Sequence, residues 1–441
     1  MTLMIGFVAL VILLVLGVPV LYCFGAVIVY FAVEFGYSAM ALFPTMYGKL
    51  ASVTLMCIPM FIMAGAVMEK GKIGDALVNF IELFLQKIKG SLSIVMTVAC
   101  AVFGSICGSG GATLTCIGSI ILPKMRDRKY PMDMMAALCA CSAPLGMLIP
   151  PSAIQIVVAW SCNLSVLACF LSTVIPGIIL TTLLSLTSWV MLKKHPEIVT
   201  KNEELVTAEA SMSFGQKFAK RTYSAIPALM MPVIILGGIY GGIVTPTEAA
   251  GVAVVYCIPV AIFCYKGIRT PRELGGVIRN SATSTGVIMV MCVMSMVLGQ
   301  IFTMENLPNT ILNLLTGFSD NTYVILLMIN LFLVFIGMIM DDTCATMLVA
   351  PLLIPIAVEL GVSPYQMSAI IGVNLGMGNC TPPTAPFLYM SSKLAGANVA
   401  KVTKYILIYI VCAYVPTLIV TTYIPELATF LPKLILGSKF G

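Results

Sequence analysis

The sequence predicts an all-α, polytopic membrane protein that contains an inverted internal repeat. Three observations lead to this fold class: the composition, the placement of the charges, and a pattern of breaks that recurs in both halves. Of the 441 residues, 60% are hydrophobic and only 10% are charged, with a mean hydropathy of +1.05. Soluble domains carry about 25% charged residues. Apolar runs long enough to cross a bilayer recur along the chain, as expected of membrane-spanning helices.

The basic residues predict which loops lie in the cytoplasm. Of the 24 lysines and arginines, 21 fall in five clusters, at 70–89, 124–129, 193–221, 266–279 and 393–404. The short loops between these clusters carry almost none. The positive-inside rule therefore places the clusters on the cytoplasmic side. Each cluster borders a predicted span, so the basic excess indicates the lipid bilayer as a partner and does not indicate nucleic acid.

The first half of the chain, 1–192, is expected to form scaffold spans, an amphipathic helix and a hairpin. Scaffold spans are predicted near 3–17, 19–34 and 51–68. The stretch "GDALVNFIELFLQKIKG", 74–90, has apolar residues at helical spacing and predicts a cytoplasmic helix that braces the scaffold. Residues 91–125 are largely apolar, yet basic clusters stand on both sides. A segment that starts and ends on the same face predicts a re-entrant hairpin.

The tip of this hairpin is expected at "SICGSGGAT", 105–113, where glycines and hydroxyl side chains interrupt the apolar run. A broken helix over 131–163 follows, with its interruption at "SAPLGMLIPPS". Tandem prolines remove two amide donors and clash with the preceding turn, so the helix must open there. A span over 166–192 completes the first half.

The second half, 223–441, repeats this order after a cytoplasmic linker over 193–222. Spans are expected near 224–240, 246–265 and 281–301, followed by a loop over 302–322. In "TPTEAA" we expect Thr247 to cap a helix beside Glu248. A second hairpin, 323–356, has its tip at "GMIMDDTCAT". A second broken helix, 365–392, is interrupted at "NLGMGNCTPPTAP", and the final helix is predicted over 404–424.

The two halves align with each other in a single register, in which positions 102–152 pair without a gap with positions 334–384. Only 8 of these 51 positions are identical, but hairpin tip falls on hairpin tip and break on break. Pro123 meets Pro355, and Gly146 meets Gly378. Each half has five spans, an odd number, so the second half must be inverted. An inverted repeat with paired interrupted segments is typical of secondary transporters.

The breaks predict sites for a cation and an anion. An open helix exposes carbonyl oxygens that must line a cavity or bind something. The carbonyls of Gly146, Ile149 and Pro151 would suit a dehydrated Na⁺, and the start of the next half-helix would suit an anion. Hydroxyl oxygens come from Ser105, Ser109 and Thr113 at the first tip.

The second tip and break offer a similar set of oxygens. Asp341 and Asp342 are adjacent acids within an apolar segment, and such acids are functional candidates. We expect Asp341 at an ion site, together with Gly337, Gly378, Thr381 and Thr384. The substrate is expected to contact four polar residues of the tips and breaks: Ser109, Thr113, Ser152 and Asn379.

A purely structural interpretation of these features also exists. Glycines permit close packing of membrane helices, and a proline pair can simply kink a helix. Four breaks that an internal repeat pairs favour a transport site. The sequence contains no GxxxxGK[ST] motif, so ATP is not expected as an energy source, and it contains no catalytic constellation. The single histidine, His195, lies in the turn "KKHPE", and the 15 cysteines are expected to be small buried hydrophobes.

Four motifs resemble the large membrane subunit of the tripartite ATP-independent periplasmic (TRAP) transporters. They are "GGIVTPTEAA" at 241–250, "IPPSAIQIVVA" at 149–159, "GMIMDDTCATMLVAPLLIP" at 337–355 and "CTPPTAP" at 380–386. The resemblance covers essentially the whole chain. It implies an elevator-type transporter of the bacterial cytoplasmic (inner) membrane, driven by at least two Na⁺ ions and not by ATP. The implied cargo is an organic acid, such as a C4-dicarboxylate or sialic acid. The implied partners are a small four-helix membrane subunit and a periplasmic substrate-binding protein.

The resemblance also implies two Na⁺ sites. The first would involve Ser105 and Ser109 with the carbonyls of Gly146, Ile149 and Pro151. The second would involve four residues of the other hairpin and break: Gly337, Gly378, Thr381 and Thr384. This sequence departs from the family pattern at Cys107, where a hydroxyl is usual, and a thiol is a poorer Na⁺ ligand.

Two alternatives to a tripartite system stay open at this stage. One is a one-component Na⁺/carboxylate symporter or antiporter of related hairpin architecture. The other is a membrane-embedded enzyme or channel, against which stand the lack of an acid/base or metal cluster and the two re-entrant tips. The sequence does not identify which organic acid is carried.

Overall fold

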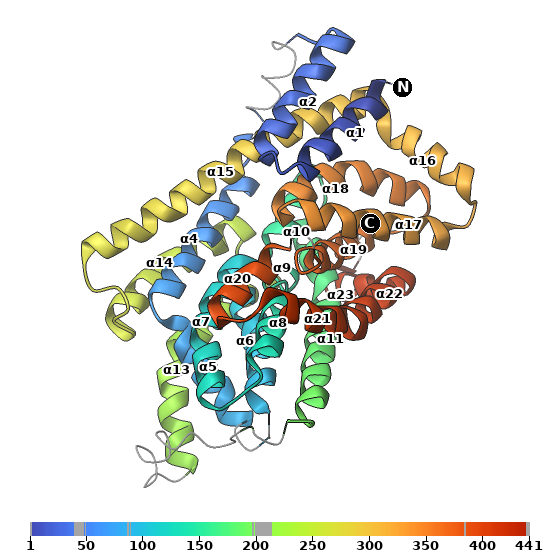
Figure 1. Ribbon diagram of the computed structural model, residues 1–441. Coiled ribbons are helices and arrows are strands. Elements are labelled where there is room, and N and C mark those ends of the chain that lie inside the picture. Colours follow the sequence, from blue (N-terminus) through green and yellow to red (C-terminus); the bar gives the residue numbers. More distant parts are fainter. Residues whose placement is uncertain are drawn as a thin grey trace.

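The computed structural model describes residues 2–38, 48, 50–85, 88, 90–195, 198, 214–382 and 385–437. Within these ranges every regular element is a helix (Figure 1). Eight of the described helices are long and apolar enough to cross a membrane, or nine if the bent pair at the first break is one span. The prediction of an all-helical, polytopic chain is confirmed.

The N-terminal spans form helices close to their predicted limits. They are α1 (Thr2–Val15), α2 (Val20–Phe35) and α4 (Cys57–Lys70), which the short 3-10 turn η1 (Val53–Met56) precedes. The amphipathic segment forms α5 (Ile73–Leu85). Phe84 on this helix is 58% exposed, so part of its apolar surface faces outward.

The first hairpin and the first broken helix occur where the sequence predicts them. The hairpin is α6 (Ser91–Cys107) and α7 (Gly110–Asp127). The broken helix is α8 (Met132–Ser142), the single turn α9 (Leu145–Leu148) and α10 (Ala153–Ser161), and the axis bends by 42° at this break. The next span is α11 (Val166–Leu192). At the hairpin turn Gly108 has φ +63°, a left-handed conformation that glycine adopts without strain.

Helix α5 packs against the first hairpin as well as against α13 (Phe214–Tyr240). A buried ion pair explains this placement, because Arg128 Nη2 lies 2.6 Å from Glu82 Oε1 and both side chains are almost fully buried. Lys124 Nζ is 3.6 Å from the other carboxylate oxygen. The expectation that this helix braces only the scaffold is therefore too narrow, since its charge partner lies at the base of the hairpin.

The middle of the chain forms three long helices. They are α13, then α14 (Pro246–Pro259), which continues into the π-turn η2 (Val260–Cys264), and α15 (Pro271–Met304). Helix α13 begins inside the segment predicted as a linker. Thr245 caps α14, because its side chain accepts from Glu248 N while the Glu248 carboxylate accepts from Thr245 N. The expected cap by Thr247 is wrong, since that hydroxyl donates to Val53 O at 3.1 Å.

The second hairpin and the second broken helix follow in the predicted order. The hairpin is α17 (Thr322–Ile339) and α18 (Asp342–Glu359), and the broken helix is α19 (Pro364–Gly378) and α20 (Pro386–Ala395). The last predicted span is α21 (Val399–Tyr409), the π-turn η3 (Ile410–Tyr414) and α22 (Val415–Tyr423).

Two helices were not predicted. The expected loop over 302–322 contains α16 (Leu307–Phe318), and α23 (Pro425–Leu436) follows the helix that was expected to be the last. Both begin at or beside a proline that suits the first turn of a helix. Both are too short to span, so a search for long apolar runs passes over them.

The helix limits follow the same register as the sequence repeat. In the alignment that pairs Gly146 with Gly378, both ends of α7 fall on the ends of α18, and the last residue of α6 falls on the last residue of α17. The first residue of α8 likewise falls on the first residue of α19. In Figure 1 the first hairpin lies below the two breaks and the second hairpin lies above them. The inversion of the two halves stays a prediction.

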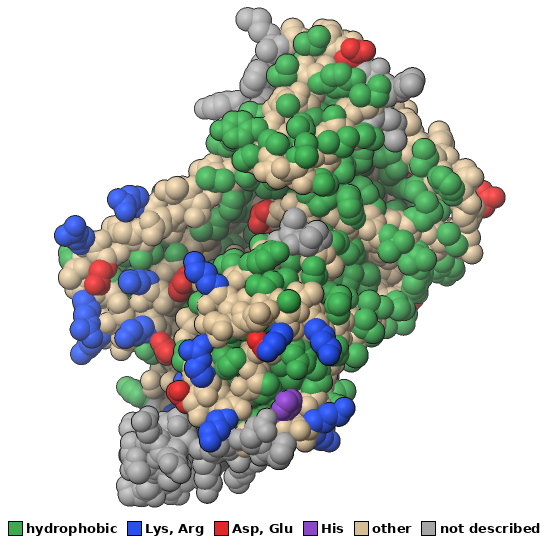
Figure 2. All heavy atoms as spheres, in the orientation of Figure 1, with side chains coloured by type: hydrophobic (Ala, Val, Ile, Leu, Met, Phe, Trp, Pro, Cys, Tyr) green, Lys and Arg blue, Asp and Glu red, His purple; other side chains and the backbone are tan. Residues whose placement is uncertain are grey.

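The basic side chains gather toward one end of the face that Figure 2 shows. Figure 2 shows the lysine and arginine side chains on the lower part of this face, around α5, α13 and the start of α15. The upper part of the same face, over α1 and α2, shows none among the described residues. This distribution agrees with the predicted cytoplasmic placement of the basic clusters.

Candidate functional site

The first hairpin tip contacts the first break at glycines, which let the two backbones come close together. A Cβ on Gly104 would lie 2.2 Å from the Cα of Gly146, so the two backbones touch. A Cβ on Gly108 would lie 2.8 Å from the carbonyl oxygen of Pro151. The carbonyl of Gly108 accepts from Ala153 N at 3.3 Å. The structure thus brings the predicted tip against the predicted carbonyls.

Oxygen atoms at this contact fit a small cation. The carbonyls of Ile149 and Pro151 receive no hydrogen bond from any described donor, and prolines 150 and 151 supply no amide hydrogens. The peptide bond between these prolines is cis. Ser105 is buried, and its hydroxyl donates to Val102 O at 2.7 Å, which leaves its oxygen lone pairs available. Hydroxyl and free carbonyl oxygens are suitable Na⁺ ligands at an opened helix.

The thiol of Cys107 is part of the tip's own packing. Its Sγ lies 3.3 Å from Thr113 Oγ1 and donates to Ser109 O at 3.5 Å. A Cβ on Gly65 of α4 would lie 2.8 Å from the Cys107 Cβ, so the thiol side fits against a scaffold span. Cys107 therefore packs against Thr113 and α4.

The start of α7 has amides without a described partner and open space beside Gly111. Ser109 is the N-cap, but its side chain makes no capping hydrogen bond. The first N–H groups of a helix lack partners within the helix, here those of residues 110–112. A Cβ on Gly111 would meet nothing within 4 Å. Free amides and the positive end of a helix dipole attract an anion.

The four residues predicted to touch substrate have different surroundings. Ser109 is half-buried and its hydroxyl has no described partner. Thr113 is fully buried and donates to Ser109 O at 2.8 Å. Ser152 is fully buried too; it donates to Met147 O and accepts from Gln155 N. Thr113 and Ser152 thus hold the backbone of the tip and the break, whereas Ser109 is open to a ligand.

The second tip and break meet in the same way. A Cβ on Gly378 would lie 2.6 Å from the Cα of Gly337. Thr381 N donates to Gly378 O at 2.9 Å, and the Thr381 hydroxyl donates to Met377 O at 2.7 Å. Asn379 is 1% exposed, and its Oδ1 has no hydrogen-bond partner among the described residues. Thr384 lies outside the described residues.

The two acids at the second tip lie at the N-terminal end of α18. Asp341 is the N-cap of α18 and accepts from Thr343 N at 3.2 Å through Oδ2. Its side chain is exposed, and Asp342 follows in the first turn. A carboxylate at this position stabilises the positive end of the helix. The Asp341 side chain also interacts with the neighbouring carboxyl group of Asp342.

The two breaks pack against each other as one unit. A Cβ on Gly376 would lie 2.9 Å from the Pro144 Cβ. Gln155 Nε2 of the first broken helix donates to Ser368 O of the second at 3.2 Å. Cys380 Sγ at the second break donates to the Ala140 carbonyl of α8 at 3.2 Å. A shift in one break is therefore transmitted to the other.

A side-chain hydrogen bond lies near each glycine contact. In the first unit Ser142 donates to Thr97 at 3.4 Å, and in the second Asn374 Nδ2 donates to Asn330 Oδ1 at 2.8 Å. In each bond the partner on the hairpin lies seven residues before the hairpin glycine, and the partner on the broken helix lies four residues before the break glycine. We call these bonds the hydroxyl clamp and the amide clamp. Sequence reasoning missed them, although amides inside apolar spans are a usable signal.

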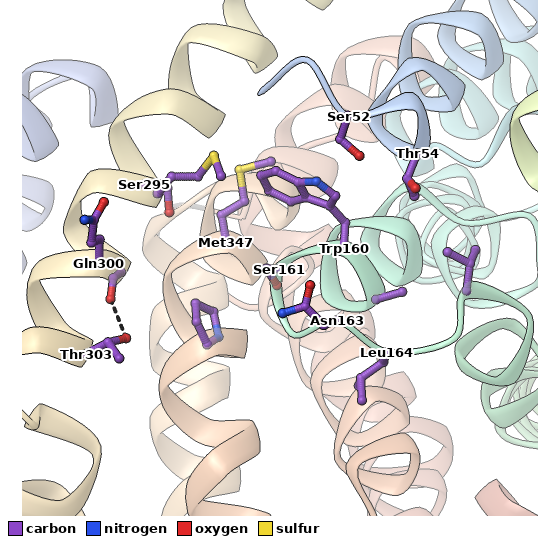
Figure 3. Close-up of a pocket in the computed structure, with 15 residues that line it drawn as sticks. Ser52, Thr54, Trp160, Ser161, Asn163, Leu164, Ser295, Gln300, Thr303 and Met347 are labelled. Carbon is purple, nitrogen blue, oxygen red and sulfur yellow. Dashed lines mark hydrogen bonds between the residues drawn. The ribbon is translucent and has the colours of Figure 1, made fainter. Parts of the chain in front are cut away.

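A cavity of about 640 Å³ lies beside these units, toward η1 and α15 (Figure 3). Its walls come from four separate segments: the residues at η1, the end of α10 with the start of α11, α15, and α18. Residues so distant in sequence share no motif, which is why sequence reasoning did not find the cavity.

The family model for the DctM component of the tripartite ATP-independent periplasmic transporters matches residues 7–427. The chain belongs to this family. The match covers the scaffold spans, both hairpins and both breaks, so the resemblance inferred from the four motifs is confirmed. This TRAP large subunit is a multi-pass protein of the bacterial inner membrane and a component of a transport system.

Relatives of this TRAP subunit include proteins with different cargoes in their names. The isethionate TRAP transporter permease protein DctMQ of Oleidesulfovibrio alaskensis is 33% identical over 385 residues, which are 87% of this chain and 59% of that protein. The C4-dicarboxylate TRAP transporter large permease protein DctM of Pseudomonas aeruginosa is 33% identical over 384 residues, 86% of each chain. The chain therefore spans less than two thirds of the first relative and most of the second.

A solved structure shares the fold. The crystal structure of the Alcanivorax borkumensis YdaH transporter matches with a TM-score of 0.58 over 91% of this chain and 90% of that one. The two sequences are 13% identical, so the likeness concerns the fold alone.

Proposed function

We propose that this TRAP subunit carries an organic acid into the cytoplasm, driven by the entry of Na⁺. The cargo is a carboxylate, such as a C4-dicarboxylate or sialic acid. A periplasmic binding protein delivers it, and a small four-helix membrane subunit completes the complex. The observation that carries the proposal is the paired contact of tip and break, which leaves the carbonyls of Ile149 and Pro151 without a described donor.

Two Na⁺ ions occupy the two tip–break contacts in this proposal. The first ion uses Ser105 and Ser109 with the carbonyls of Gly146, Ile149 and Pro151. The second uses the group around Gly337 and Gly378, with Thr381, Thr384 and the carboxylate of Asp341. Asn379 Oδ1 is buried without a described partner, and a buried acceptor in that state favours a cation or a donor from the cargo.

The carboxylate of the cargo binds at the start of α7. The amides of residues 110–112, the Ser109 hydroxyl and Asn379 recognise it, because amides and hydroxyls can bind an anion without a basic side chain. An ion at the neighbouring carbonyls holds the tip in place and adds positive charge. Each ligand then raises the affinity for the other, which is the thermodynamic requirement for coupling.

Movement follows the elevator scheme in this proposal. The hairpins and broken helices form the moving unit, and α1, α2, α4 and α13–α15 form the scaffold. The packing of the two breaks on each other supports a single rigid moving unit, since Gln155 and Cys380 tie one broken helix to the other. An inverted repeat provides the two related faces that alternate access requires.

Uptake in proteoliposomes tests the proposed function. We expect accumulation of a labelled organic acid only with an inward Na⁺ gradient, the binding protein and the small subunit present. Accumulation without a Na⁺ gradient would contradict Na⁺ coupling. Accumulation with this chain alone would instead support a one-component symporter or antiporter.

One hydroxyl provides the residue-level test. Thr381→Val removes an oxygen of the second ion site, so half-maximal uptake is expected to require about tenfold more Na⁺. Thr417→Val is the matched control, because Thr417 is buried in α22 and donates to Ala413 O in the same helical manner. An unchanged Na⁺ activation curve for Thr381→Val removes Thr381 from the site.

A further inference from the structure

We propose that the cavity between α15, α18 and the α10–α11 turn binds an uncharged, hydroxyl-bearing organic molecule with one apolar face. This site is separate from the ion and carboxylate sites at the tips. It does not depend on which ion or acid is transported. Four features of the cavity support the proposal: an unpaired buried hydroxyl, the absence of charge among the described residues of its lining, an aromatic wall and its size.

Ser295 has a buried hydroxyl that lacks a partner. Its side chain is 2% exposed, and its Oγ makes no hydrogen bond to any described residue, although the residue lines the cavity. Other hydroxyls on α15 bond to the carbonyl one turn back: Ser281 to Val277 and Thr303 to Gly299. A buried hydroxyl without a partner is costly, so a ligand gains affinity when the Ser295 side chain rotates to pair with it.

The described part of the lining is polar but carries no charge. None of the 15 residues that line the cavity is acidic, basic or a histidine. A charged ligand would lose its hydration without a compensating partner, which disfavours an anion or a metal ion. Hydroxyls and amides both donate and accept hydrogen bonds, as the hydroxyl groups of a polyol or sugar require. The polar lining residues are Ser52, Thr54, Ser161, Asn163, Ser295, Gln300 and Thr303.

The other part of the lining is aromatic and apolar. Figure 3 shows the Trp160 ring and the Met347 side chain converging on the cavity from α10 and α18. Trp160 is half-buried, so one surface of its ring is accessible. An indole offers a flat apolar face and one N–H donor. This combination matches a ring that has hydroxyls on its edge and C–H groups on its face.

The volume is suited to a small molecule. About 640 Å³ falls within the range of roughly 300–1,000 Å³ that ligand pockets occupy. A molecule of this size would contact α15 and α18 at the same time, because both helices line the cavity. Its binding therefore links the second hairpin to a scaffold helix.

Tryptophan fluorescence provides a direct test. The chain has two tryptophans, so Trp189→Phe leaves Trp160 as the only indole. The full-length variant is studied in lipid nanodiscs, without glycoside detergent. The probe is 4-nitrophenyl β-D-glucopyranoside, an uncharged glycoside whose nitrophenyl group quenches indole emission at short range. Saturable quenching is expected, and the charged probe 4-nitrobenzoate is expected to give none that saturates.

Two further variants connect the binding to the cavity. Ser295→Ala in the Trp189→Phe background is expected to weaken binding about fivefold, which corresponds to about 1 kcal/mol. Ser281→Ala is the matched control, because Ser281 is buried on the same helix with its hydroxyl already paired. The proposal is overturned by an absence of saturable quenching, by equal affinities of the two serine variants, or by tighter binding of 4-nitrobenzoate.

Discussion

The two hairpins contact matching glycines of their breaks through hairpin glycines that lie one position apart in the register of the repeat, and the neighbouring side chains differ. In hairpin 1, α6 with α7, Gly104 meets Gly146, and in hairpin 2, α17 with α18, Gly337 meets Gly378. The clamps that precede these contacts have the same spacing but consist of hydroxyls in one hairpin and amides in the other. The repeat has thus kept the backbone geometry and allowed the chemistry to diverge.

The tips also differ in charge. The start of α7 carries glycines and no side-chain cap, whereas Asp341 caps α18 and Asp342 follows it. One tip therefore presents free amides, which attract an anion, and the other presents carboxylates, which repel one. In the proposed function, the first tip therefore binds the anion and the second tip a cation.

The bases of the hairpins are held differently. Hairpin 1 is tied to α5 by the buried pair of Arg128 and Glu82. In the register of the repeat, α16 corresponds to α5, but Leu307 is its only buried residue and Phe318 is 72% exposed. Hairpin 1 is therefore anchored by charge, while hairpin 2 relies on the amide clamp and apolar contacts.

The largest effect is expected from breaking the anchor of hairpin 1. Arg128→Met leaves Glu82 buried with only the more distant Lys124 as a partner. Removing one partner of a buried pair costs about 3–5 kcal/mol. The measurement is the thermal unfolding midpoint of the purified protein, with Lys129→Met as an exposed control in the same segment. Glu82→Leu combined with Arg128→Met should recover stability; no recovery would contradict an electrostatic anchor.

The second largest effect is expected at the glycine contacts. The two hairpins should lose different amounts of unfolding free energy when these glycines are replaced. A Cβ on Gly104 would lie 2.2 Å from backbone, whereas one on Gly337 would lie 3.2 Å from backbone. Gly104→Ala is thus expected to cost about 3 kcal/mol and Gly337→Ala about 1 kcal/mol. Gly286→Ala on α15, where a Cβ meets nothing within 4 Å, is the control. Equal losses of unfolding free energy at positions 104 and 337 would refute this order.

Breaking the amide clamp is expected to cost more unfolding free energy than breaking the hydroxyl clamp. Asn374→Leu leaves the Asn330 acceptor without its donor in a buried site, at a cost of about 2 kcal/mol. Ser142→Ala removes a bond of 3.4 Å and should cost about 0.5 kcal/mol. Na⁺ activation of uptake gives a second readout, which Asn374→Leu should shift more than Ser142→Ala. The reverse order would show that bond length does not decide the strength of a clamp.

The smallest effect is expected at Cys107. Its sulfur contacts the Thr113 hydroxyl and the Ser109 carbonyl oxygen. Cys107→Ser keeps these contacts, so the Na⁺ concentration for half-maximal uptake should change by less than about threefold. Uptake at graded Na⁺ concentrations measures this value. A large change would place side chain 107 within the first ion site.

Much of the fold followed from the residues because the bilayer imposes strict rules. Apolar length placed the spans, and Pro150, Pro151 and Gly108 marked a break and a tip that the structure contains. The short helices α16 and α23 were not predicted, because neither is long enough to cross a membrane. The cap of α14 was assigned to Thr247 and not to Thr245, because sequence spacing alone does not show which hydroxyl faces the helix end.

The sequence by itself determined the family, the helical class, the order of hairpins and breaks, and the repetition of that order in the second half. Backbone rules explain this, because proline, glycine and apolar length act locally wherever they occur. Only the tertiary structure decided which atoms meet: Gly104 with Gly146, Arg128 with Glu82, Asn330 with Asn374, and the four segments around Ser295. Contacts of this kind depend on how helices distant in sequence pack together, and local propensity does not encode that packing.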